Sequence, residues 1–204
     1  SESEAPIRYY LNQYGNTTRM VNIDIGGGTT DISIADQKNV LFTTSFRFAS
    51  NVLFEDSYAK ASRFNGIVDS FKGNIYEMLQ NNDTLKELKE IFESIDNSGK
   101  PANLASFLFG INDTSLAKDV NLANIDFTTI LQNDEKFKVV FLIFYGAIIY
   151  QVAQIIKAKD IKEPRHISFS GNGSKIITIL TQDIQGRNSI LSEFTKAIFE
   201  VVLE

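Results

Sequence analysis

Hydrophobic residues between positions 20 and 48 occur in three short runs. The runs at Met20 to Ile25, Thr30 to Ala35 and Val40 to Phe48 are rich in β-branched or aromatic residues, and Ile32 and Ile34 fall on one face of the second. Such runs predict strands, and the glycine and polar residues between them predict tight turns. We therefore expect an antiparallel meander of three strands.

Apolar residues three and four positions apart predict helices before and after this meander. A short helix is expected near the start of the sequence, because Ser3 can cap it and Pro6 suits its first turn. We expect this helix to end before Gly15. A fourth strand is expected at His166 to Phe169. The other expected helices are Ser50 to Leu79, Leu85 to Ile95, Ala102 to Phe109, Glu135 to Lys159, Lys175 to Leu180 and Ser189 to Val202.

Residues 81–133 differ from the rest of the chain, because their expected helices are short and separated by polar breaks. The breaks lie at Asp96 to Pro101 and at Asn112 to Ser115. We therefore expect a small helical subdomain at 81–133, inserted into a core domain that is formed by 1–80 and 134–204.

Composition and charge exclude several classes of function. The chain has 20 basic and 25 acidic residues, a net charge of -5 and no basic cluster, so nucleic acid is not an expected partner. It has no cysteine, which excludes disulfides, zinc-thiolate sites and cysteine nucleophiles. The single histidine, His166, precedes an apolar strand without a carboxylate cluster beside it, and this favours a structural role.

Two segments bear on localisation. Ser1 to Ala5 is polar and acidic, unlike the basic and then apolar start of a secretory signal, so a cytoplasmic protein is expected. The most apolar segment, Val139 to Val152, is interrupted by polar residues and falls short of the roughly 20 apolar residues that a bilayer requires. We expect it to form a buried core helix and no membrane span.

The most informative motif is the run Asp24-Ile25-Gly26-Gly27-Gly28-Thr29-Thr30-Asp31, between the first two expected strands. Its three consecutive glycines let the backbone approach a ligand, and such a turn points N–H groups outward. Those groups can hold phosphate oxygens, the Thr29 hydroxyl can add a donor, and Asp24 can hold a hydrated divalent cation. The alternative is structural: the glycines only close a β-hairpin, and both aspartates are solvated turn residues.

A second small-residue turn, Ser170-Gly171-Asn172-Gly173-Ser174-Lys175, follows the fourth expected strand and leads into a helix. Such a turn offers N–H groups and the positive end of a helix dipole to an anion or a ribose oxygen. Asn172 could cap the helix that starts near Ser174, adopt a left-handed backbone angle or touch the ligand.

These motifs resemble those of the actin/Hsp70/sugar-kinase ATPase superfamily. Asp24 to Asp31 is similar to its second phosphate motif, which runs acidic-hydrophobic-Gly-Gly-Gly-Thr-x-Asp, and Ser170 to Lys175 is similar to its adenosine motif. Glu2 to Tyr10 resembles the Glu-x-x-Ala-x-x-x-x-Tyr helix that precedes the second domain of Hsp70-like members. The resemblance implies an α/β ribonuclease-H-like domain: a mixed sheet that begins with the antiparallel meander, helices on both faces, and a small helical insertion.

The resemblance also implies binding of ATP or ADP with Mg²⁺. Asp24 and Thr29 are the catalytic candidates, and Asp24 would hold the metal through water or orient the attacking water. The residues that would contact the phosphates are Gly26, Gly27, Gly28, Thr29 and Thr30. Those that would line the adenosine pocket are Gly171, Asn172, Gly173, Ser174 and Lys175, although a lysine on a helix surface is more often simply solvated.

In this superfamily, ATP is hydrolysed in a cleft between two domains, and the first domain has a phosphate loop of its own. The chain has one such loop, in the position of the second domain. The resemblance therefore implies that the first domain is a missing partner and that this chain alone binds nucleotide weakly.

The whole protein would be a chaperone-like machine, a filament-forming actin relative or a small-molecule kinase. The Gly-Gly-Gly-Thr-Thr-Asp sequence looks more like the Hsp70 and bacterial actin branches, and Ser45 to Asp56 lacks the glycine-rich segment of true Hsp70. The alternative is a nonhydrolysing module that uses nucleotide only to set its shape or to assemble into a homo-oligomer or filament.

Overall fold

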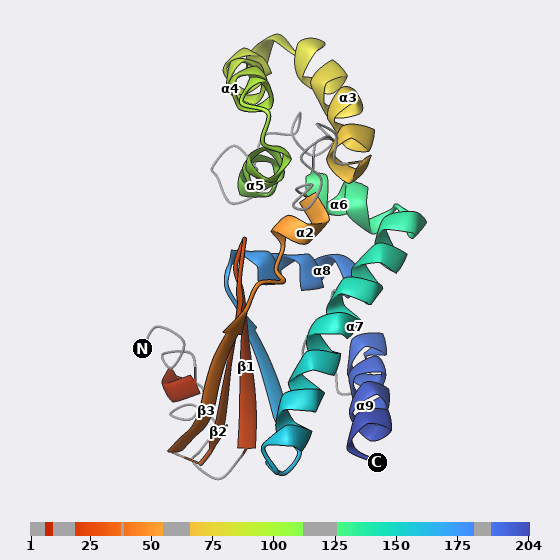
Figure 1. The fold of residues 1–204 in the computed structure, drawn as a ribbon. Coiled ribbons are helices and arrows are strands. Elements are labelled where there is room, and N and C mark those ends of the chain that lie inside the picture. The colour runs from red at the N-terminus through yellow and green to blue at the C-terminus, as the bar shows by residue number, and fades with distance from the viewer. Residues whose placement is uncertain (1–6, 10–18, 38, 55–65, 112–125, 182–188) are drawn as a thin grey trace. The chain divides into compact units, whose positions relative to one another are not determined.

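The computed structural model describes residues 7–9, 19–37, 39–54, 66–111, 126–181 and 189–204 (Figure 1). Its strands are β1 (Arg19–Ile25), β2 (Thr30–Asp36), β3 (Asn39–Phe46) and β4 (His166–Ser170). Its α-helices are α2 (Asn51–Phe54), α3 (Gly66–Gln80), α4 (Lys86–Asn97), α5 (Pro101–Ile111), α6 (Phe127–Gln132), α7 (Glu135–Ala158), α8 (Ile177–Leu180) and α9 (Ile190–Leu203). Two short 3-10 helices are η2 (Asp83–Leu85) and η5 (Asn172–Ile176).

The strands form one mixed sheet in the order β3-β2-β1-β4. β1 to β3 pair antiparallel, and this confirms the predicted α/β class and its meander. The third strand ends at Phe46, two residues before the expected Phe48. β4 pairs with β1 in parallel, and Asp24 lies opposite Ser170. Parallel pairing therefore brings the carboxyl ends of β1 and β4, and the turns that follow them, to the same edge of the sheet.

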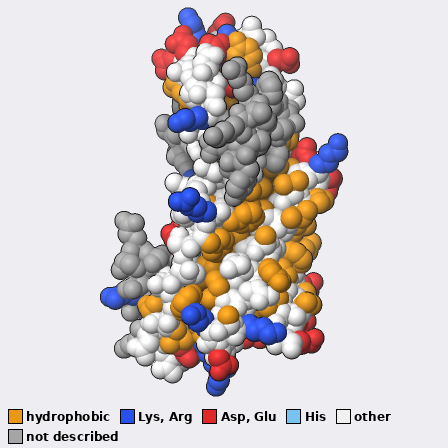
Figure 2. Space-filling model, in the orientation of Figure 1, with side chains coloured by type: hydrophobic (Ala, Val, Ile, Leu, Met, Phe, Trp, Pro, Cys, Tyr) orange, Lys and Arg blue, Asp and Glu red, His pale blue; other side chains and the backbone are white. Residues whose placement is uncertain are grey.

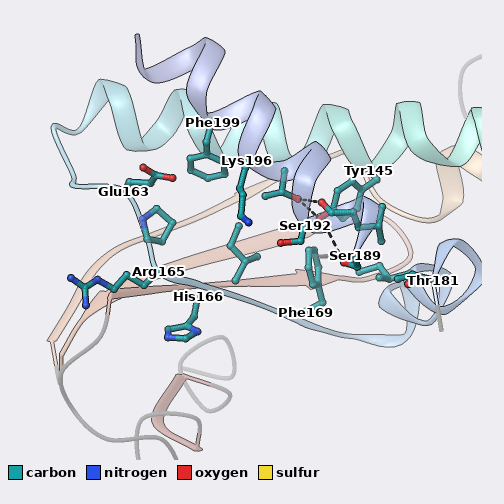
Figure 3. A pocket seen from close by; sticks show the side chains of 15 residues that line it. Tyr145, Glu163, Arg165, His166, Phe169, Thr181, Ser189, Ser192, Lys196 and Phe199 are labelled. Carbon is teal, nitrogen blue, oxygen red and sulfur yellow. Dashed lines mark hydrogen bonds between the residues drawn. The ribbon is translucent and has the colours of Figure 1, made fainter. Parts of the chain in front are cut away.

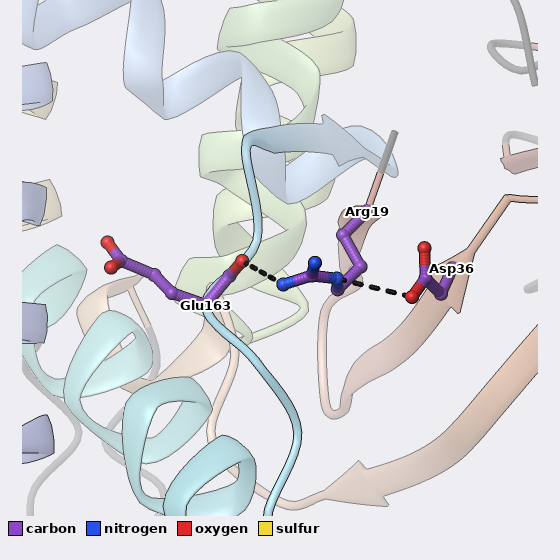
Figure 4. A network of polar contacts seen from close by, with 3 residues as sticks. All are labelled: Arg19, Asp36 and Glu163. Atoms are coloured by element: carbon purple, nitrogen blue, oxygen red, sulfur yellow. Dashed lines mark hydrogen bonds and ion pairs between the residues drawn. The ribbon is translucent and has the colours of Figure 1, made fainter. Parts of the chain in front are cut away.

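A polar network fixes the opposite end of β1 and β4 (Figure 4). Arg19 donates from Nε to the Asp36 carboxylate at 3.2 Å and from Nη1 to the Glu163 carbonyl oxygen at 3.0 Å. The Arg165 amide in turn donates to the Arg19 carbonyl oxygen at 3.0 Å. These bonds hold the segment before β4 against β1 and so help to set the register of the parallel pair.

The two faces of the sheet differ in polarity. On one face, Val21, Ile23 and Ile25 are buried, and the ring of Phe169, which pairs with Ile23, lies 5.8 Å from that of Tyr145 in α7. Fully burying one such aliphatic side chain contributes about 1.5–3 kcal/mol. The opposite face of β1 carries Met20, Asn22 and Asp24, the residues that alternate with these. Figure 1 shows α7 and α9 along the apolar face and the helical residues 7–9 on the other side.

Contacts divide the chain into two compact units, residues 1–50 with 139–204 and residues 51–138. The second unit begins earlier than the insertion expected at 81–133, because α3 packs with α4. Tyr76 donates its hydroxyl to Glu93 at 2.7 Å, and Lys72 pairs with Asp96 at 3.2 Å. The Phe109 ring contacts the Phe54 and Phe127 rings within the same unit.

The predicted helices fall on the observed ones with some differences. The single helix expected from Ser50 to Leu79 is represented by α2 and α3, and residues 55–65 between them lie outside the described part, as does most of the first expected helix. α6 was not predicted from the sequence. Asp126 caps α6, because its carboxylate accepts hydrogen bonds from the amides of Thr128 at 2.9 Å and Thr129 at 3.3 Å.

α7 is apolar on both sides. The side toward the sheet is buried, whereas Val139, Ile143 and Tyr150 are exposed on the other. In the described part of the chain, α7 is long and apolar enough to cross a membrane by length and composition alone, a test that core helices of soluble proteins also pass. Figure 2 shows the exposed hydrophobic side chains gathered over α7 and α9.

Candidate functional site

The two glycine turns predicted from the sequence lie against each other at the carboxyl ends of β1 and β4. Gly173 packs directly on the end of β1, because a Cβ added there would lie 2.7 Å from the Ile25 carbonyl oxygen and 2.9 Å from that of Gly26. A Cβ added at Gly171 would collide with the Asp24 carboxylate and with the Ile25 backbone. The structure therefore places the carboxylate of Asp24, the first residue of the first motif, directly against the second motif.

The first turn has a fixed base. The Gly26 amide donates to the Thr29 carbonyl oxygen at 2.9 Å, which closes the hairpin between β1 and β2. Ser50 donates to the Gly26 carbonyl oxygen from its hydroxyl at 2.8 Å and from its amide at 3.2 Å. Thr30 is buried, and its hydroxyl donates to the Phe48 carbonyl oxygen at 2.6 Å. The Thr30 hydroxyl, predicted as a ligand contact, is thus used within the fold.

The tip of the first turn is exposed. Gly27, Gly28 and Thr29 are all open to solvent, and an added Cβ on Gly28 would meet no atom within 4 Å. The backbone of Gly28 does not have a positive φ. Within the described residues, the amides of Gly27 and Gly28 donate no hydrogen bond. These N–H groups are the donors that an anionic ligand would need.

The second turn is built more tightly. Gly171 has a φ of 82°, in the left-handed region that glycine adopts without a steric penalty, and it accepts hydrogen bonds from the Ser174 amide at 3.1 Å and hydroxyl at 2.7 Å. Asn172 does not have the positive φ that was one of its three predicted roles. Its side chain and that of Lys175 are exposed, whereas the Ser174 hydroxyl is held inside the turn.

The expected helix at Lys175 to Leu180 is replaced by η5 and the four-residue α8. Gly171 stands at the start of η5 without a side-chain cap, so Asn172 does not cap a helix that starts near Ser174. A macrodipole sums over aligned peptide units, and these elements supply few of them. The predicted contribution of a helix dipole to ligand binding at this turn is therefore small.

Asp24 belongs to a row of hydrogen-bonded polar side chains that the sequence reasoning did not single out. We define this polar row as Ser168, Asn22, Ser170 and Asp24, which alternate between β4 and β1. Ser168 Oγ lies 2.9 Å from Asn22 Oδ1, and Asn22 Nδ2 lies 3.1 Å from Ser170 Oγ. The row ends where Ser170 Oγ lies 3.0 Å from Asp24 Oδ2. The signal in the sequence was the polar residues at every second position of two otherwise apolar strands.

The charged groups near the turns suit one type of cation site. Among the described residues, no group of three or more His, Cys, Asp or Glu side chains could hold a metal ion. Asp31 lies opposite Asp24 in the β1–β2 pair, and a site with one or two carboxylates suits Mg²⁺, which keeps several water molecules and also binds phosphate oxygens. Asp24, half-buried beside the exposed amides, fits this arrangement.

A cavity of about 330 Å³ lies elsewhere, between β4, α7 and α9 (Figure 3). Tyr145 and Thr195 both line the cavity, and their hydroxyls form a hydrogen bond of 2.7 Å. Burial raises the pKa of Tyr145. Lys196 reaches toward it from α9, whereas His166 points away from α9. The cavity is lined by none of the residues predicted to bind nucleotide, so it does not belong to the site at the glycine turns.

The predicted site residues thus fall into two groups. Asp24, Gly27, Gly28, Thr29, Asn172 and Lys175 present groups at the surface of the two turns, and Gly26, Thr30, Gly171, Gly173 and Ser174 hold the turns in place. The assignment of a function rests on this geometry. Comparison with known proteins found no family model and no curated protein that matches the chain.

Proposed function

We propose that the chain is the nucleotide-binding second domain of an actin/Hsp70-like ATPase with a ribonuclease-H-like fold. In this proposal it holds the phosphates and adenosine of Mg-ATP in a cleft that another domain completes. One observation carries the proposal: two glycine turns that are far apart in the sequence pack together, with the carboxylate of Asp24 against the second. A hairpin that served only to reverse the chain would need no such neighbour.

The first turn would bind the phosphates. Gly27, Gly28 and Thr29 are exposed and follow closely after Asp24 in the chain, so their amides and the Thr29 hydroxyl can donate hydrogen bonds to a phosphate group. A bound Mg²⁺ would supply charge neutralisation for the terminal phosphates. Asp24 would hold water molecules of that cation and orient the attacking water by accepting its hydrogen bond.

The second turn would bind the nucleoside. Gly171 and Gly173 bring its backbone against β1, and this close packing leaves the side chains of Asn172 and Lys175 at the surface. The side-chain amide of Asn172 can form hydrogen bonds with the ribose or the base, and the aliphatic part of the Lys175 side chain can pack on the base. Ser174 would act through the turn, because its hydroxyl bonds to the Gly171 carbonyl oxygen.

A second candidate is a nonhydrolysing module that assembles in response to nucleotide. The exposed apolar side chains of α7 and α9 favour it, since an exposed apolar patch of this kind often marks an association surface. Phosphate release separates the two candidates. An ATPase loses turnover in Asp24→Ala, whereas an assembly module shows ATP-dependent light scattering without any turnover to lose.

The test of nucleotide binding is calorimetric titration of Mg-ATP into the chain and into the longer, two-domain protein that the proposal implies. Gly28→Val places a branched side chain where the fold leaves space but the phosphates would lie. We expect it to weaken binding at least tenfold, about 1.4 kcal/mol. Gly73→Ala is the matched control, because Gly73 also has open space around it but lies in α3. Absence of binding to both wild-type proteins would favour the structural interpretation of the first turn.

A further inference from the structure

The polar row has only one hydrogen-bonding direction that satisfies all of its members. The Asp24 carboxylate can only accept, so Ser170 must donate its single hydroxyl proton to Asp24 Oδ2, 3.0 Å away. Ser170 Oγ is then left as an acceptor and receives an N–H of Asn22 at 3.1 Å. Asn22 Oδ1 consequently faces Ser168, which donates to it at 2.9 Å. Each of these three hydrogen bonds is donated in the direction of Asp24.

The row is also costly for a purely structural element. Asn22 is 1% exposed, and burying an amide gains little over an apolar side chain even when the amide is hydrogen-bonded. Ser33, directly opposite Asn22 in β2, is buried with a hydroxyl that makes no hydrogen bond within the described part of the chain. An apolar pair of the same shape at these positions can be equally stable or more stable, so stability alone does not account for the polar groups.

From this geometry we infer that Ser170, supported by Asn22 and Ser168, is a positioning residue that fixes the Asp24 carboxylate for a hydrated divalent cation. The inference rests on the proposed function. Ser170 binds Oδ2 of Asp24, and the backbone of Gly171 packs against Oδ1, so the carboxylate cannot rotate without breaking a contact. A carboxylate held in this way loses little conformational freedom when it receives the water molecules of a cation.

The experiment is a nuclear magnetic resonance titration of the chain with ATP, with and without Mg²⁺, followed through the amide signals of Gly27 and Gly28. In the wild type we expect Mg²⁺ to tighten ATP binding. In Ser170→Ala we expect this Mg²⁺ effect to fall about tenfold, the strength of a hydrogen bond to a charged group, and metal-free affinity to change less than about twofold. Ser170→Thr keeps the hydroxyl and should restore the effect.

Ser33→Ala is the matched control, because it removes a buried hydroxyl from the same face of the sheet but not from the polar row. It should leave both titrations unchanged. A full Mg²⁺ effect in Ser170→Ala would overturn the inference and leave the proposed function intact. An equal loss of metal-free and Mg²⁺-dependent binding would also overturn it, since it would mean that Ser170 only supports the fold. Absence of ATP binding by both the wild-type chain and the longer two-domain protein would instead contradict the proposed function.

Discussion

The two glycine turns are similar in composition and lie in contact, yet their glycines are present for different reasons. Gly171 has a left-handed backbone and packs so closely on β1 that a methyl group would collide with Asp24 and Ile25. Gly28 has neither constraint, because its φ is not positive and no atom lies within 4 Å of an added Cβ. The fold therefore explains Gly171 but not Gly28, for which the proposed phosphate site would account.

The largest effect is expected at Gly171. Gly171→Ala should lower the free energy of unfolding by about 3 kcal/mol or more, because it combines an unfavourable left-handed angle with overpacking against β1. Gly99→Ala is the control, since Gly99 has a φ of 68° but open space around it, and should cost only about 1–2 kcal/mol. Urea denaturation measures both. Equal losses in the two variants would show that the close packing of the second turn contributes nothing.

A smaller effect on the free energy of unfolding is expected at the two threonines of the first turn, Thr29 and Thr30. Thr30→Val should cost about 1–2 kcal/mol of unfolding free energy, because the Phe48 carbonyl oxygen loses its buried donor. Thr29→Val replaces an exposed hydroxyl and should change stability by less than about 0.5 kcal/mol. Nucleotide binding should show the reverse order, with the larger loss in Thr29→Val. A larger binding loss in folded Thr30→Val would restore Thr30 as a direct ligand contact.

The sequence contained much of the local structure of these turns but not their proximity. Strand periodicity predicted the meander, and the glycine runs predicted both turns, because each of these signals lies within a few residues. The contact between the turns depends on the parallel register of β1 and β4, which pairs Asp24 with Ser170 across most of the chain. No local pattern encodes that register.

Other features went unpredicted for related reasons. The partnership of Asn22 with Ser170 follows from the same parallel register, although the polar residues themselves were visible in the sequence. The placement of α3 with the helical unit depends on contacts such as Tyr76 with Glu93 between separate helices. α6 has only six residues, too few to show a clear helical periodicity of apolar positions. Its clearest signal in the sequence was the capping residue Asp126.

The smallest effect on stability is expected at Gly28, and it decides the comparison. Gly28→Ala should leave the free energy of unfolding unchanged or raise it by about 0.4–1 kcal/mol, because alanine restricts the unfolded chain and meets no obstacle in the folded one. A protein selected only for stability would have no reason to keep glycine at this position. If Gly28→Ala is as stable as the wild type and binds Mg-ATP more weakly, the open tip of the turn is reserved for phosphate. A variant that loses stability while binding ATP normally would mean that the first turn, like the second, needs its glycine for the fold.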